Sequence, residues 1–189
     1  MTVYDTMQSI TYKLQDTMLR KAPITEWELD IARSSTLPWV LLQPEERSAL
    51  AEMLFATHGT TLPFLEYFSR DKDPFIRKKV AIHQHTPVAL LKQLASDAEW
   101  IVRATVATNN KTPTNVLSKL AHDENAEVRE YAACHKNISH VDIELLADDP
   151  DCSVREAIIK RRDCPEHLIE KMKKDKSDKI RSIASKNSL

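Results

Sequence analysis

Glycine is nearly absent from this 189-residue sequence, in which Gly59 is the single example. Average usage near 7% would give about 13 glycines. Phosphate-binding loops, dinucleotide fingerprints and tight β-hairpin turns need several glycines for positive φ angles and close backbone approach. The composition therefore argues against nucleotide-cradling folds and against folds rich in β-hairpins.

Cysteine, net charge and long apolar runs are also scarce. The three cysteines, Cys134, Cys152 and Cys164, are odd in number and lack CxxC spacing, which indicates neither a disulfide framework nor a clustered metal site. No run approaches the roughly 20 apolar residues of a membrane span, and the start of the chain lacks the pattern of a secretion signal. We therefore expect a cytoplasmic protein without cofactor, metal or membrane contact.

Charge is balanced overall, with a formal net charge of −1, but it is unevenly distributed. Residues 101–150 contain five basic and eight acidic side chains, whereas residues 151–189 contain eleven basic and seven acidic ones. A basic end of this kind can attract a polyanion.

A repeat of 26 residues, without gaps, begins at Phe68 and extends to the end of the chain. Its units are 68–93, 94–119, 120–145, 146–171 and a partial unit, 172–189. Two columns are invariant, an aspartate at 71, 97, 123, 149 and 175 and an arginine at 77, 103, 129, 155 and 181. A fixed period of this length is typical of solenoid and array proteins.

Each unit predicts two short helices. The first begins near a proline, as at Pro87, Pro113 and Pro165, because proline fits the first helical position. The second begins after a column of mostly good N-caps and buries a stripe at i, i+4 spacing, such as Ile76 with Val80. Two helices of about ten residues are unstable alone, so stacking on neighbouring units must complete the core.

The repeated string x-V-R-x-x-V-A-x-N/H after a D-x-D/N/S turn, preceded by T-P-x-x-L-L-x-x-L-A, resembles the bacterial leucine-rich repeat variant and related HEAT-like repeats. The resemblance covers about 68–189 and implies an all-α, right-handed α-solenoid. Some members of that family hold an iron–sulfur cluster on N-terminal cysteines. Residues 1–67 contain no cysteine, so we do not transfer the cofactor.

Residues 1–67 are less regular than the repeats. Helical stretches are predicted over roughly 3–20, 26–34 and 44–57. We interpret 1–67 as a helical segment that caps the apolar end of the array 68–189, because terminal units of solenoids need a polar outer face. The alternative is a separate activity in this segment.

The aspartate and arginine columns allow two interpretations. One is a structural ladder of ion pairs, in which each carboxylate also accepts N–H groups of its turn. The other is a phosphate-binding rail, because the planar guanidinium fork binds phosphate well. The ladder is favoured, because an equal number of aspartates at matched spacing would neutralise such a rail.

Apolar residues interrupt an otherwise polar surface at the start of two predicted second helices. Phe75, Trp100 and Ile101 are apolar where the later units carry mostly polar residues, and Tyr131 is a weaker candidate of the same kind. Such residues commonly mark a partner site. The alternative is that the N-terminal cap or a loop covers them.

Basic residues concentrate near the end of the chain, including Lys160, Arg161 and Arg162. Together with the arginine column, they define an alternative function in DNA binding, by Arg77, Arg103, Arg129, Arg155, Arg181, Lys160, Arg161 and Arg162. Interleaved acidic residues and the absence there of aromatic side chains favour a solvated end face instead.

Catalytic motifs are not evident. The seven histidines form no HExxH pattern, and no glycine-framed nucleophile is present. The sequence thus predicts a non-catalytic scaffold that binds a protein partner through the row of second helices.

Overall fold

A computed structural model describes residues 62–187 of the chain, and every regular element in that range is an α-helix. The predicted helices over 3–20, 26–34 and 44–57 lie outside the described residues. The chain forms two compact units, 1–87 and 88–189. The predicted boundary between the cap and the array at residue 67 stays a prediction.

The first unit contributes two described helices, α5 (Leu62–Phe68) and α6 (Pro74–Ile82). Leu65 and Phe68 of α5 and Ile76 and Val80 of α6 are fully buried, as their helical spacing predicts. The Asp73 carboxylate accepts a hydrogen bond from the Phe75 amide and caps α6.

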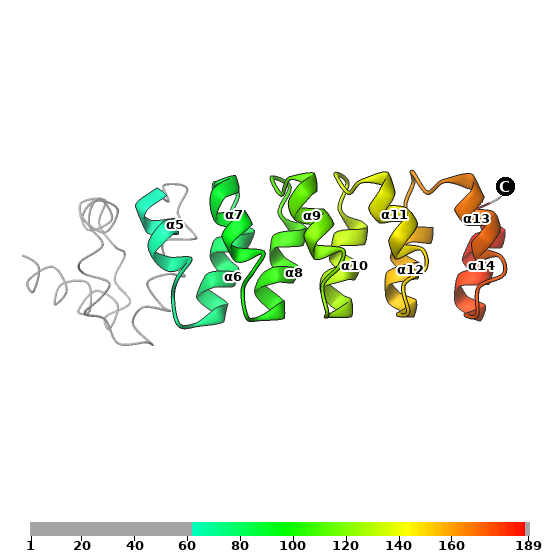
Figure 1. Ribbon diagram of the computed structural model, residues 1–189, viewed down its shortest axis with the longest axis horizontal. Helices are drawn as coiled ribbons and strands as arrows, with labels where there is room; N and C mark the ends of the chain where they lie inside the picture. The colour runs from blue at the N-terminus through cyan, green and yellow to red at the C-terminus, as the bar shows by residue number, and fades with distance from the viewer. Residues whose placement is uncertain (1–61, 188–189) are drawn as a thin grey trace, which may run out of the picture. The chain divides into compact units, whose positions relative to one another are not determined.

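The second unit is a row of helix pairs (Figure 1). The first helices of the pairs form one layer and the second helices form the other. The first helices have seven residues and the second helices eight or nine, somewhat shorter than the ten predicted. In chain order the helices are α7 (Val88–Leu94), α8 (Trp100–Thr108), α9 (Thr114–Leu120), α10 (Ala126–Cys134), α11 (His140–Leu146), α12 (Cys152–Ile159), α13 (Glu166–Met172) and α14 (Asp178–Lys186).

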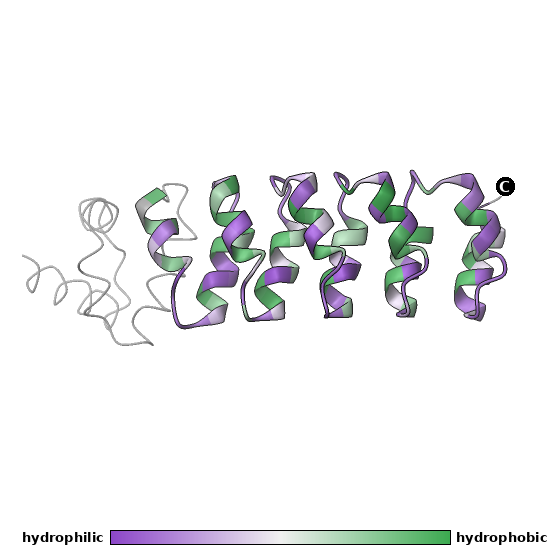
Figure 2. Cartoon of the chain, in the orientation of Figure 1, coloured by the Kyte–Doolittle hydropathy of each residue, from purple (hydrophilic) through white to green (hydrophobic). Residues whose placement is uncertain are grey.

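The core of this unit lies between the two layers. Val102, Val128, Val154 and Ile180 point into it from successive second helices and have no measurable exposure. Figure 2 shows such hydrophobic residues in green on each helix of the row. The predicted all-α solenoid is confirmed for this part of the chain, and the handedness of its superhelix stays a prediction.

The second helices begin where the N-cap column predicted, at the residues after Glu99, Asn125, Asp151 and Ser177. The first helices begin one residue later than predicted. Pro113 and Pro165 are N-caps, with ψ angles of 156° and 139°, and not the first helical residues. Ser139 occupies the same N-cap position, and its side chain accepts a hydrogen bond from the Asp142 amide. Proline has no such acceptor, but its fixed φ angle favours the start of a helix.

Candidate partner-binding surface

The predicted ladder is present between successive repeats of the second unit. Arg103 donates from Nε and Nη2 to the Asp123 carboxylate, at 2.7 and 2.8 Å. The same bidentate pairs, with distances of 2.7 to 3.0 Å, join Arg129 to Asp149 and Arg155 to Asp175. Bidentate pairing matches the guanidinium and carboxylate forks and is the strongest form of this contact.

We call each arginine–aspartate pair a rung of the ladder. The arginine and the aspartate of a rung also form hydrogen bonds within the turns to which they belong. The Nη1 group of Arg129 donates to the backbone carbonyl groups of Asp123 and Glu124, at 2.9 and 3.1 Å. The aspartate of every turn accepts the amide two residues later, as Asp149 does from Asp151 at 2.8 Å. The ladder therefore joins neighbouring repeats and closes the turn within each repeat.

The ladder is largely removed from solvent. Arg155 is 3% exposed, and the hydrogen bonds from its guanidinium hold the pKa of the Asp175 carboxyl below its usual range. The same contact with Asp175 raises the pKa of Arg155. A phosphate group could reach Arg103, Arg129 or Arg155 only by displacing a buried carboxylate.

The arginines at the two ends of the column also bind the carbonyl groups of their own turns. In the first unit, Nη1 of Arg77 donates to the carbonyl groups of Asp71 and Lys72, at 2.8 and 3.1 Å. Arg181 donates to the Asp175 carbonyl at 2.6 Å and forms an ion pair with Asp178 in its own helix. Both arginines therefore fix their own turn as the internal rungs do.

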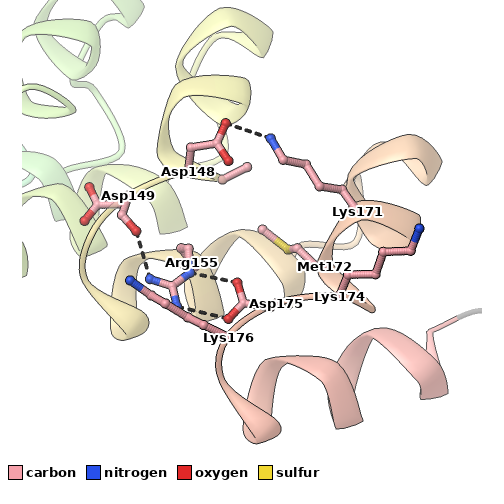
Figure 3. A pocket seen from close by; sticks show the side chains of 9 residues that line it. Asp148, Asp149, Arg155, Lys171, Met172, Lys174, Asp175 and Lys176 are labelled. Carbon is pink, nitrogen blue, oxygen red and sulfur yellow. Dashed lines mark hydrogen bonds and ion pairs between the residues drawn. The ribbon is translucent and has the colours of Figure 1, made fainter.

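A pocket of about 280 Å³ lies beside the last internal rung (Figure 3). Arg155 and Asp175 form part of its wall, and Lys171 reaches across to Asp148 at 2.7 Å. Lys174 and Lys176 add positive charge at its edge. The carboxylates of the lining pair with Arg129, Arg155 and Lys171, so Lys174 and Lys176 leave the pocket with a modest excess of positive charge.

Of the three basic residues predicted to face solvent after α12, Arg161 has a side chain that is only 6% exposed. Nη1 of Arg161 donates to the Ala133 and His135 carbonyl groups, at 2.5 and 3.0 Å, and Nη2 pairs with Asp163. Lys160 is exposed and pairs with Glu156, and Arg162 is exposed. Arg161 therefore binds the preceding repeat, which the sequence analysis did not predict.

Arg161 belongs to a column that links repeats along a second line. His135 occupies the same position one repeat earlier, and its Nε2 lies 3.1 Å from the Asn109 carbonyl oxygen. Asn187, one repeat later, donates to the Ile159 carbonyl at 2.8 Å. Each of these side chains thus satisfies a carbonyl group at a helix end of the preceding repeat.

The predicted apolar anchors lie at the surface. Phe75 is 64% exposed in the first unit, and its grouping with the anchors of the second unit stays a prediction. Trp100 and Tyr131 are 38% and 46% exposed in the second unit, and Ile101 is partly exposed. Tyr131 extends beyond the buried Thr105 and Ala157, which occupy its position in the adjacent repeats.

One side of the second helices, on which Tyr131 lies, can be defined from the repeat. Positions 2, 5, 6 and 9 of each helix fall within one arc of about 100°, opposite the buried stripe. We call these positions of α8, α10, α12 and α14 the second-helix face. They comprise Ile101, Ala104, Thr105 and Thr108; Glu127, Glu130, Tyr131 and Cys134; Ser153, Glu156, Ala157 and Lys160, which directly follows α12; and Lys179, Ser182, Ile183 and Lys186. Ala104, Thr105, Glu156 and Ala157 are buried, and the other members are partly or fully exposed.

Exposed apolar residues on the first helices were missed by the sequence analysis. Val141 and Leu145 of α11 are 77% and 44% exposed and lie one turn apart. The column comparison contained the signal, because the corresponding positions of α9 and α13 are polar: Asn115, Lys119, His167 and Lys171.

The chain is similar to a solved structure described as a leucine-rich repeat variant with a novel repetitive protein structural motif. The two are 20% identical, with a TM-score of 0.40, and the match covers 96% of this chain and 82% of that one. No protein-family model and no curated protein matches the chain. The description of that structure is that of the family which the repeated sequence of residues 68–189 resembles, the leucine-rich repeat variant.

Two further findings concern residues 62–187 alone. None of the helices there has both the length and the apolar character needed to cross a bilayer. No group of three histidine, cysteine, aspartate or glutamate side chains in the same range converges closely enough to hold a metal ion.

Proposed function

We propose that the chain is a protein-binding scaffold whose partner contacts the second-helix face and the adjoining Trp100. The observation that carries the proposal is the exposure of Trp100 and Tyr131 on a repeat array whose framework residues are buried. Tryptophan and tyrosine are enriched among the residues that dominate binding energy at protein interfaces, whereas valine and leucine are under-represented. The second-helix face is therefore a better candidate than Val141 and Leu145.

The repeat supports this assignment by its contrast between fixed and variable positions. Arginine and aspartate are invariant in the ladder, whereas the position of Trp100 holds alanine, cysteine or aspartate in later repeats. Trp100 is 38% exposed and belongs neither to the ladder nor to the buried stripe. Its contribution is to a surface that differs from repeat to repeat, as selective binding of one partner requires.

The test is partner capture from native cells by the full chain, with the double variant Trp100→Ala and Ile101→Ala. We expect the variant to keep its helical circular dichroism and to lose the captured partner, because truncating a few anchors typically costs about 2 kcal/mol or more each. The matched control is Val141→Ala with Leu145→Ala, which removes exposed apolar groups from the other layer. Unchanged capture by the Trp100 and Ile101 variant would refute the proposal.

A further inference from the structure

Two glutamates at the same position of successive second helices have different surroundings. In α12, the Glu156 carboxylate binds two lysines, Lys160 one turn later at 2.5 Å and Lys179 of the next repeat at 2.7 Å. In α10 the equivalent residue is Glu130. The glutamate at this position of a second helix can therefore bind one lysine of its own repeat and one lysine of the next repeat.

Glu130 lacks both of these lysines. Cys134 stands where Lys160 stands in the next repeat, and Ser153 stands where Lys179 stands. Within residues 62–187, neither Glu130 nor the nearby Glu127 forms an ion pair. Two carboxylates on one surface of α10 are therefore left without the cations that the next repeat provides.

The apolar anchors lie beside these carboxylates. Tyr131 follows Glu130 directly and shares the second-helix face with Glu127, one turn earlier. Ile101 of α8 occupies the position that Glu127 occupies in α10, and α8 adds no charged residue to the face. Helices α8 and α10 pack against each other, so apolar and acidic groups meet on one surface.

We propose that this surface of α8 and α10 binds a polypeptide segment in which an aromatic or aliphatic side chain is flanked by lysine or arginine. One cation takes the position on Glu130 that Lys160 or Lys179 takes on Glu156, a second pairs with Glu127, and the apolar side chain packs against Tyr131, Ile101 and Trp100. This inference rests on the proposed scaffold function and specifies the chemistry of the partner. Complementary charge fixes the register of such a segment.

The probe is a fluorescein-labelled peptide with the sequence Gly-Ser-Lys-Phe-Arg-Leu-Lys-Ser-Gly, titrated into the full chain and followed by anisotropy. Two matched peptides replace either the basic residues by glutamate or the apolar residues by serine. We expect the first peptide to bind more tightly than both others, and its affinity to fall as salt is added. Equal affinity for the acidic peptide would overturn the proposal, as would no binding of any peptide.

Variants of the chain locate the site. The pair Glu127→Gln and Glu130→Gln should weaken the peptide about three- to tenfold, as expected for two partly exposed ion pairs. Tyr131→Ala should weaken it more than about tenfold. The control pair Glu144→Gln and Glu166→Gln makes the same change of charge on α11 and α13 and should leave the affinity unchanged.

A variant in which lysines of the chain itself pair with Glu130, called the filled variant, gives the sharpest test. Cys134→Lys with Ser153→Lys restores on Glu130 the two lysines that Glu156 has, and should weaken peptide binding at least about threefold while the fold is kept. Conversely, Lys160→Cys with Lys179→Ser should free Glu156. Unchanged affinity for the peptide in the filled variant overturns the inference.

The result can be separated from the proposed function. If the native partner is lost with Trp100→Ala and Ile101→Ala but kept by the filled variant, the scaffold function stands and the basic-apolar segment is wrong. A self-association measured by sedimentation and abolished by Tyr131→Ala would assign the surface to a second copy of the chain, and would also overturn the inference.

Discussion

At the scale of single residues, the arginine of each rung has more than one task. Arg129 forms a bidentate pair with Asp149 of the next repeat and closes its own turn through two carbonyl groups. Its side chain is 14% exposed and that of Asp149 is 5% exposed. Removing the arginine therefore leaves a buried carboxylate with no paired cation, only the Asp151 amide as donor, and leaves two turn carbonyl groups without the arginine N–H.

We expect Arg129→Gln to lower the free energy of unfolding by about 3 kcal/mol, near the lower end for a broken buried pair because Arg129 keeps some exposure. Urea unfolding followed by circular dichroism measures the loss. Arg162→Gln is the matched control, because Arg162 is exposed and the change of charge is the same. A loss in Arg129→Gln no larger than in the control would contradict a structural role for the ladder.

His135 makes the fold sensitive to acid. Burial is the main cause that lowers its pKa, and nearby Lys136 and Arg161 lower it further, although the Asn109 carbonyl acts in the opposite direction. Its Nδ1 accepts a hydrogen bond from the Asn137 amide at 3.0 Å, which a protonated ring cannot do. The native state therefore prefers the neutral imidazole.

Because the pKa is lower in the folded than in the unfolded chain, the contribution of His135 is complete above about pH 6.5 and is lost as pH falls through the folded pKa. We expect the free energy of unfolding to be smaller at pH 5.0 than at pH 7.5. His135→Asn should reduce that difference, because asparagine does not titrate in this pH range. Asparagine is also the residue at the equivalent position one repeat earlier, Asn109. An identical pH dependence in variant and parent would exclude His135 as its source.

At the scale of the helix, caps account for most of what the sequence predicted well. The second helices start where the N-cap column predicts, because a side-chain oxygen that binds free amides is a local signal. The Asn125 side chain accepts from the amides of Glu127 and Val128. The start of α9 was misplaced by one residue because Pro113 fixes φ but leaves ψ extended.

The burial of Arg161 and the ion pairs of Glu156 depend on groups of neighbouring repeats, so the local sequence does not predict them. Arg161 looks like a surface cation in sequence, yet it is buried because carbonyl groups of the preceding repeat accept its protons. The difference between Glu130 and Glu156 is likewise invisible in either helix alone. It follows from comparing columns once the structure shows that Lys160 and Lys179 meet at one carboxylate.

Among the caps of the second helices, Glu99 and Ser177 make no capping hydrogen bond with their side chains, and Glu99 is the longer of the two. We expect Glu99→Asp to stabilise the fold by about 0.5–1 kcal/mol, because the shorter carboxylate reaches the free amides as Asp151 does in α12. Thermal unfolding gives the measurement, and Asp151→Glu should produce a loss of similar size. A destabilised Glu99→Asp variant would show that another contact of Glu99 outweighs the cap.

At the scale of the whole molecule, the distribution of charge separates protein binding from DNA binding. The chain is nearly neutral, and many of its cations are committed within the described residues. Arg103, Arg129 and Arg155 bind aspartates. Near the basic end, pairs with acidic side chains occupy Lys160, Arg161, Lys171, Lys173, Lys179 and Arg181.

This internal pairing leads us to expect no saturable binding of duplex DNA at about 50 mM salt, because most phosphate contacts near the basic end would require an existing ion pair to break. Fluorescence anisotropy with a labelled duplex at about 50 and 200 mM salt measures it. A protein that contacts six to ten phosphates loses about 10³- to 10⁵-fold in affinity over that range. A loss of that size, reduced in Lys174→Gln with Arg162→Gln, would instead assign DNA binding to the exposed basic residues. The ladder would remain structural in either case, since its guanidinium groups are held by buried carboxylates.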